Sequence, residues 1–356
     1  MRIPISPRFP TRLVRCAARP ALRGLLLIAL AAALAVPADA QSGGAPAEQD
    51  GDFNKGGRTA FQFLKIGVGA RQAALGEASV AIVRDVSSTF WNPAGISGID
   101  RYEAAFSYTR WLADMNYAAA AIGGRVPGIG TFALSVAALD YGDLPEAVIV
   151  PGGGDGRTGE SFSGSDVLVG LAYARDFTDR LSIGLGVKYL HESLWEYSAS
   201  TVAFDVGTHY TVGYRGLRLA MSAQNFGGSV GWLDEGAADR QEGYDLPLVF
   251  RVGVAGNLVG PDAFFGVDGP HRVVGSVEAV NTNDFSERLH FGAEYIYNEL
   301  FAVRGGYRLN YAEGNWSLGA GLTPPPVGNV RLRVDYAYVG YEFLAAPHRF
   351  TVAFAF

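Results

Sequence analysis

Short segments in which apolar residues alternate with polar or small ones constrain the fold of this chain more than any other feature. In residues 181–189 every second residue is apolar, and Ser182, Gly184, Gly186 and Lys188 lie between them. Successive side chains of a strand point to opposite faces, so this pattern predicts a strand with one apolar face. Fourteen such segments begin near Tyr102, Met115, Gly130, Asp166, Leu181, Thr201, Leu217, Leu246, Arg272, Arg288, Leu300, Asn315, Val330 and His348.

The number of segments and the lengths of their links predict an all-β fold, a closed transmembrane antiparallel β-barrel. An even strand number and alternating short and long links are typical of bacterial outer-membrane barrels, with the short turns in the periplasm. The short links are Val126–Gly128, Thr178–Arg180, Gly213–Gly216, Asn298–Glu299 and Pro324–Gly328. The two longest links, Asp140–Gly164 and Gly227–Asp245, fall on the predicted outside, whereas Val259–Pro270 is long for an inner turn.

The N-terminus predicts export. Residues 1–23 hold six Arg and no acidic residue, an apolar run extends from Leu25 to Val36, and Ala38-Asp39-Ala40 follows. This order is typical of a secretory signal peptide, here cleaved before Gln41. The apolar run is shorter than the ~20 residues of a membrane-spanning helix. The predicted organisation is a signal peptide at 1–40, a periplasmic tail and plug at 41–100, and the barrel at 101–356.

Cleavage would change the composition. The mature chain keeps 23 of 29 basic and 34 of 35 acidic residues, so its net charge becomes −11 instead of −6, and it loses the only Cys. An acidic exported chain is not expected to bind nucleic acid. The 47 Gly and 49% hydrophobic residues suit either a soluble secreted β protein or an outer-membrane barrel.

The C-terminal segment His348–Phe356 favours the outer membrane and its lipid. Its apolar face consists of Phe350, Val352, Phe354 and Phe356. A last strand that ends in Phe resembles the signal read by the bacterial barrel-assembly machinery, and these four residues are the predicted signal. A plain strand of a soluble sandwich is the alternative, but so apolar an edge would promote aggregation in water. In a barrel the last strand pairs with the first.

The segment Phe61–Ile99 lacks the alternation of a strand. Asn92-Pro93 predicts the start of a helix or turn, with Asn as the cap. The segment resembles the N-terminal region of the PorV/PorQ family and, more distantly, the hatch of FadL-type outer-membrane transporters. The resemblance is carried by Gly69-Ala70-Arg71, Leu75-Gly76-Glu77-Ala78, Val80-Ala81 and Trp91-Asn92-Pro93-Ala94-Gly95. Arg84-Asp85 departs from it, because the family more often has an acidic pair there.

The resemblance implies a FadL-like barrel of fourteen strands with its N-terminal segment folded into the lumen as a plug. PorV and PorQ proteins belong to the type IX secretion machinery, so it also implies a non-enzymatic role in protein secretion, with secretion subunits or secreted cargo as partners. The alternative is a FadL-like channel with a hydrophobic ligand in its lumen. An apolar patch around Trp232 and Tyr244 would favour protein partners, whereas a pocket beside the plug and a lateral gap in the wall would favour transport.

Charged residues at inward positions predict the character of the lumen. The expected cluster comprises Arg251, Glu278, Glu294, Arg304, Arg308, Arg331, Arg333 and Asp335. Charges sheltered from water need partners. One hypothesis is that Arg71, Glu77, Arg84 and Asp85 of the plug supply them and pin the plug to the wall; the alternative is a wet lumen of mixed charge.

Motifs for catalysis or cofactor binding are not found in the sequence. The five His residues have no metal-ligand spacing. The glycine run at 152–156 lacks the Lys-Ser/Thr of a phosphate loop, and no Gly-x-Ser-x-Gly elbow occurs. We therefore expect no enzyme activity, no cofactor and no metal.

Overall fold

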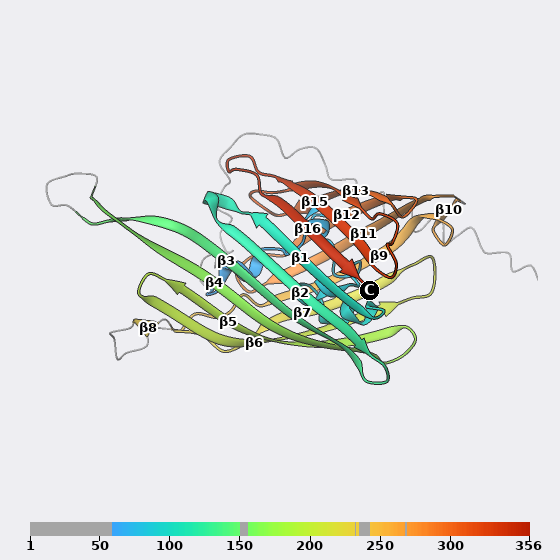
Figure 1. The fold of residues 1–356 in the computed structure, drawn as a ribbon, viewed down its shortest axis with the longest axis horizontal. Coiled ribbons are helices and arrows are strands. Elements are labelled where there is room, and N and C mark those ends of the chain that lie inside the picture. The colour runs from blue at the N-terminus through green and yellow to red at the C-terminus, as the bar shows by residue number, and fades with distance from the viewer. Residues whose placement is uncertain (1–58, 150–155, 232, 235–242, 268) are drawn as a thin grey trace, which may run out of the picture. The chain divides into compact units, whose positions relative to one another are not determined.

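One sheet closes on itself to form the barrel. The computed structural model describes residues 59–149, 156–231, 233–234, 243–267 and 269–356. Among these residues, β8 (Leu233–Asp234) and β10 (Phe265–Gly266) are short additions to the sheet, and fourteen of the sixteen strands form the wall. β16 pairs antiparallel with β1, and β7 pairs antiparallel with β9, so the wall is continuous (Figure 1). The predicted fold class is confirmed.

The wall strands begin close to the predicted positions, except that β4 starts nine residues early. They are β1 (Tyr102–Arg110), β2 (Asn116–Val126), β3 (Gly130–Ala147), β4 (Arg157–Asp176), β5 (Leu181–Leu194), β6 (Tyr197–Thr211), β7 (Arg218–Phe226), β9 (Val249–Gly260), β11 (His271–Thr282), β12 (Arg288–Tyr297), β13 (Phe301–Leu309), β14 (Trp316–Leu322), β15 (Arg331–Gly340) and β16 (His348–Ala355).

The expectation of a long loop over Asp140–Gly164 was wrong. β3 and β4 continue to pair there, with Leu144 opposite Phe162, and the hairpin extends past its neighbours (Figure 1). Both faces of this extension are largely exposed. The apolar alternation therefore ends while backbone pairing continues, which is why the sequence pattern underestimated the strands.

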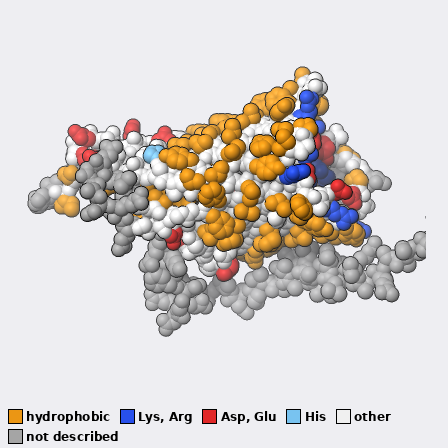
Figure 2. All heavy atoms as spheres, turned by 90° about the horizontal axis from the view of Figure 1, so that it is seen from below, with side chains coloured by type: hydrophobic (Ala, Val, Ile, Leu, Met, Phe, Trp, Pro, Cys, Tyr) orange, Lys and Arg blue, Asp and Glu red, His pale blue; other side chains and the backbone are white. Residues whose placement is uncertain are grey.

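The alternation separates an apolar outside from a polar inside. Large exposed hydrophobic residues lie along the outer face of every long strand, among them Ile122, Leu134, Leu171, Leu185, Val303 and Leu318. Figure 2 shows such side chains across the middle of one face, with charged side chains toward the ends. Inward neighbours such as Lys188 and Asp335 are buried. No helix in the described part of the chain is long and apolar enough to cross a membrane.

The two ends of the barrel differ. We call the end with the short links 127–129, 177–180, 212–217, 298–300 and 323–330 the turn end, and the opposite end, with links 148–156 and 227–248, the loop end. The short-turn rule predicts that the turn end faces the periplasm. The predicted signal peptide, and with it the cleavage before Gln41, lies outside the described residues.

Residues 59–99 form a plug inside the wall. The plug contains η1 (Gln62–Lys65), α2 (Ala70–Ala74), η2 (Val86–Phe90) and η3 (Pro93–Gly98), all helices of six residues or fewer. Asn92 caps η3: its side chain accepts a hydrogen bond from Ala94 N at 3.1 Å, with Pro93 at the first helical position. The predicted turn signal is therefore confirmed.

Glycines in the wall let the plug approach closely. A Cβ atom added to Gly306 on β13 would lie 1.9 Å from Gly76 N, and one added to Gly184 on β5 would lie 2.2 Å from Ala94 N. Real side chains cannot occupy such positions unless the backbone shifts. Part of the glycine content therefore shapes the inner surface of the barrel to the plug.

Candidate functional site: a plug ion-paired to the lumen wall

A two-pronged ion pair joins Arg71 of the plug to the wall. Arg71 lies in α2, which follows Gly69, whose φ of 97° favours glycine. Its Nε donates to Glu294 Oε1 at 3.0 Å, and its Nη2 donates to Glu294 Oε2 at 2.7 Å. Glu294 lies on β12 and is 1% exposed. A paired fork of this kind fixes orientation as well as distance.

The contact continues as a chain of ion pairs that returns to the plug. Glu294 Oε1 also accepts from Arg304 Nε at 2.6 Å, and Arg304 Nη1 donates to Asp335 Oδ1 at 2.8 Å. Arg333 donates from Nε to Asp335 Oδ2 and from Nη2 to Asp85 Oδ2 in the plug, both at 2.9 Å. We call these residues, with Arg71, the Arg71–Asp85 chain.

Two further ion pairs lie where the plug meets the wall, one between plug and wall and one within the wall. Arg308 on β13 approaches Glu77 of the plug, with Nη1 and Oε1 3.3 Å apart. Arg251 on β9 donates to Glu278 Oε1 on β11 at 3.0 Å, and the other oxygen of Glu278 accepts from the Val80 backbone N at 2.8 Å. Glu278 thus accepts one hydrogen bond from a side chain of the wall and one from the backbone of the plug.

The plug carboxylates are held in the charged form. Burial by itself raises the pKa of Glu77, but Arg308 and Arg349 outweigh it, and the pKa lies below its ordinary value of 4.5. Burial likewise opposes ionisation of Asp85, but Arg333 holds its pKa below the ordinary 3.8. Both groups are therefore anions at neutral pH, and these contacts are true ion pairs.

The ion-pair hypothesis describes most, but not all, of the charged residues that the sequence singled out. Arg71, Glu77 and Asp85 pair with the wall as expected. Among the described residues Arg84 forms no ion pair, and neither does Arg331, which is exposed at the turn end. Their positive charge is therefore left outside the network.

The Trp91–Gly95 motif docks on the wall through hydrogen bonds. Trp91 Nε1 donates to Val68 O at 2.9 Å within the plug, and Ser222 Oγ on β7 donates to Trp91 O at 2.8 Å. Asn92 Nδ2 donates to Thr208 O on β6 at 3.0 Å. The remaining motif residues, Pro93, Ala94 and Gly95, are buried in η3. The motif thus stabilises the contact between plug and wall.

Sequence reasoning missed several small polar contacts between plug and wall. Ser317 Oγ accepts from Gly76 N at 3.1 Å, and Thr351 Oγ1 accepts from Ala70 N at 2.8 Å. Ser276 Oγ donates to Ala78 O at 2.7 Å. Two wall carboxylates also accept from plug backbone: Glu103 from Val86 N and Glu192 from Phe61 N. All five lie at inward positions, so the alternation of inward and outward residues along each strand would have identified them.

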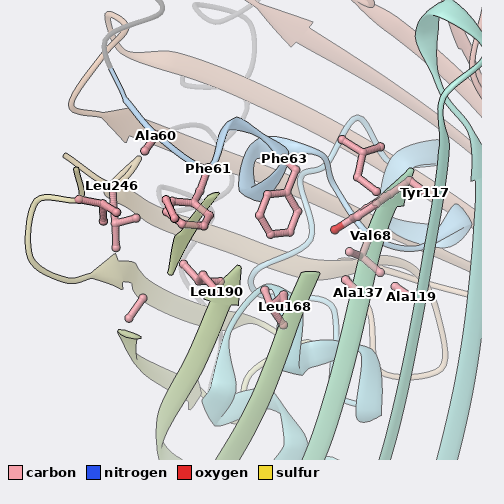
Figure 3. Close-up of a cluster of buried hydrophobic side chains, with 14 residues drawn as sticks. Ala60, Phe61, Phe63, Val68, Tyr117, Ala119, Ala137, Leu168, Leu190 and Leu246 are labelled. Carbon is pink, nitrogen blue, oxygen red and sulfur yellow. The ribbon is translucent and has the colours of Figure 1, made fainter. Parts of the chain in front are cut away.

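The loop-end side of the plug packs mainly on apolar residues, beside one ion pair between Lys65 of η1 and Asp284 in the β11–β12 link. Phe61 and Phe63 are at most 1% exposed and share a cluster with Leu168 on β4 and Leu190 on β5. Figure 3 shows Phe61 close to Leu190, and the Phe63 ring between the plug backbone and the wall. Phe61 has a φ of 51°, an uncommon value for a non-glycine residue. The backbone there is held by this burial and by Glu192.

Three cavities border the plug. Two open at the turn end, with volumes of about 580 and 210 Å³, and both are lined by Arg71, Arg272 and Glu294. A third, of about 30 Å³, lies between the plug and the wall, and its lining includes Ile66 and Phe90 but also Lys65, Lys188 and Arg251. Within the described residues no group of three His, Cys, Asp or Glu is arranged to hold a metal ion.

The predicted assembly signal lies on the outer face of β16. Phe350, Phe354 and Phe356 are exposed there, and Val352 is half-buried. β16 pairs with both β1 and β15, so it is no longer a free edge. Recognition by the assembly machinery stays a prediction. Trp232, half of the predicted protein-docking patch, lies outside the described residues, whereas Tyr244 is exposed.

Solved structures with this architecture are known. The toluene transporter TbuX of Ralstonia pickettii matches with a TM-score of 0.55 and 13% identity over 81% of this chain and 97% of its own. The toluene transporter TodX of Pseudomonas putida gives 0.55, 11%, 81% and 97%, and a FadL homologue of Pseudomonas aeruginosa gives 0.50, 10%, 79% and 96%. The barrel has the FadL-type fold. No family model and no curated protein sequence matches the chain.

At these identities the likeness extends to the FadL-type fold alone. It agrees with the strand number, the closed wall and the outer-membrane type of barrel. The finer resemblance to PorV and PorQ depends on the plug motif, which in this structure caps η3 and docks on β6 and β7. It stays a prediction.

Proposed function

We propose that this chain is a non-enzymatic outer-membrane channel for small hydrophobic molecules. The FadL-type fold supports this, because two of its structural neighbours are named as toluene transporters. The apolar outer wall supports a position in lipid, because so large an exposed apolar surface is not stable in water. The described plug fills the middle of the lumen, so passage requires part of the plug to move.

The observation that carries the proposal is the apolar contact at the loop end of the plug. A hydrophobic solute leaves water only for apolar surroundings. Phe61 and Phe63 meet Leu168 and Leu190 there, and Leu168 also lines a cavity of about 30 Å³. That volume is about the share of one water molecule in the liquid. An aromatic hydrocarbon therefore enters only when this apolar cluster opens, for example by movement of the Phe63 ring.

Uptake of radiolabelled toluene by cells that produce the chain tests the proposal. We expect faster uptake than in cells that lack it, and faster uptake still for Phe63→Ala, which removes the obstructing ring. Phe204→Ala is the matched control, because that ring lies 55% exposed on the outer face of β6. Uptake equal to that of empty-vector cells would contradict the channel function.

A second candidate is the secretion role that the plug motif implies. One structural feature favours it: the β3–β4 hairpin extends beyond the wall and exposes Val148 and Ile149, the latter 96% exposed. Exposed apolar residues beyond the membrane suit a protein partner. Native pull-down from outer-membrane extracts separates the candidates: secretion subunits or cargo would favour this role, and co-purified lipid alone would favour the channel.

A further inference from the structure

The turn end of the lumen carries more positive charge than its carboxylates balance. The 210 Å³ cavity is lined by Arg71 and Arg84 of the plug, Arg218 of β7 and Arg272 of β11, with Glu294 as the only acidic residue of its lining. Four guanidinium groups thus face one carboxylate. An arrangement of like charges around one cavity is unfavourable unless something balances it.

The single carboxylate is already occupied. Both oxygens of Glu294 accept from Arg71, and one of them also accepts from Arg304. Arg272 pairs with Glu299, whose side chain is 71% exposed. Neither Arg84 nor Arg218 forms an ion pair with any described residue, so two cations are left without a protein counterion.

Buried hydrogen-bond donors without acceptors also indicate that this cavity binds a ligand. The Nε atoms of Arg84, Arg218 and Arg272 are each buried and meet no hydrogen-bond acceptor among the described residues. Buried polar groups are nearly always hydrogen-bonded, so three such donors around one cavity indicate a ligand that accepts them. These donors come from the plug, β7 and β11, so the cavity is built by three separate elements.

We propose that this cavity is a binding site for a phosphate-class oxyanion. Guanidinium forks match the paired oxygens of phosphate, and a doubly charged anion balances the cavity better than chloride. The proposal goes beyond the channel function, because its ligand is charged and approaches from the turn end. Occupancy would place one anion between Arg84 of the plug and Arg218 of the wall, and would add a further link between them.

Inorganic phosphate is the probe for the test. The purified full chain in a nonionic detergent is titrated by calorimetry at low ionic strength, with chloride as the competing anion. We expect saturable binding that weakens about tenfold or more in Arg84→Gln and Arg218→Gln, since each removes a charge-assisted hydrogen bond. Arg218→Lys, which keeps the charge but loses the fork, should fall between Arg218→Gln and the unchanged chain.

Arg180→Gln is the matched control, because Arg180 lies in an exposed turn at the same end and lines neither large cavity. Heat-modified migration on gels checks that each variant is folded. Equal losses in Arg180→Gln, equal competition by chloride, or no saturable binding of either phosphate or a short-chain phosphatidic acid would overturn the proposal. Binding of a short-chain phosphatidic acid but not of free phosphate would assign the same phosphate chemistry to a lipid headgroup. None of these results depends on toluene uptake.

Discussion

The interactions that hold the plug to the wall differ between its two ends. Toward the turn end, the Arg71–Asp85 chain links plug and wall by charge-assisted hydrogen bonds of fixed geometry. Toward the loop end, the plug is held by one ion pair, Lys65 with Asp284, and by a hydrogen bond from Phe61 N to Glu192, and the rest of the contact is largely apolar, with Phe61 and Phe63 against leucines. Ion pairs are directional and costly to break when buried, whereas apolar contacts can slide and re-form. The comparison suggests a plug that is anchored mainly by the ion pairs toward the turn end and is more adjustable around its phenylalanines.

Breaking the anchor should have the largest effect. Glu294→Ala removes the acceptor shared by Arg71 and Arg304, so Arg71 loses its carboxylate partner and Arg304 keeps only Asp335. We expect a loss of about 3–5 kcal/mol in the free energy of unfolding, measured by urea titration in lipid vesicles. Glu299→Ala removes the partner of an exposed pair and should cost about 0.5 kcal/mol or less. Equal losses in the two variants would contradict the anchor.

A smaller effect is expected at Glu77, where one ion pair is lost. Arg308 keeps its hydrogen bond to Gly314 O after Glu77→Ala, so the expected loss is about 2 kcal/mol. The plug should loosen, and single-channel conductance in planar bilayers should rise. Unchanged conductance would mean that this pair does not hold the plug.

Acidification should have the same effect on conductance as Glu77→Ala. The pKa of Glu77 lies below 4.5 in the folded state, so its contribution to stability is fully present above that pH. It is lost as the pH falls through the lower folded-state value. Conductance should therefore rise on acidification in the unchanged chain, and rise less in Glu77→Ala, which lacks this titrating group.

The adjustable side should tolerate substitution best. Phe63→Leu keeps an apolar side chain of smaller size, and we expect a stability loss of only about 1 kcal/mol, because such swaps allow repacking. Toluene uptake should increase even so, because under the proposed channel function the Phe63 ring obstructs passage. A loss of stability as large as that of Glu294→Ala would remove the distinction between the two sides.

The alternation of inward and outward residues along the strands made much of the site predictable. Arg304, Arg333 and Asp335 lie at inward positions of strands whose alternation is clear, so their place in the lumen followed from the sequence. Their partners did not. Arg71 and Glu294 are 223 residues apart, and no local pattern links them. Arg84, expected to pair like its neighbour Asp85, instead lines the turn-end cavity.

The sequence by itself determined the wall: its strand number, its two faces and its tight turns. Those properties follow from period two and from turn residues, which act over a few neighbouring positions. Only the tertiary structure decided how the plug sits, which charges pair, and which arginines remain without a carboxylate. Those outcomes depend on distances between side chains that are far apart in the chain, and folding alone sets such distances.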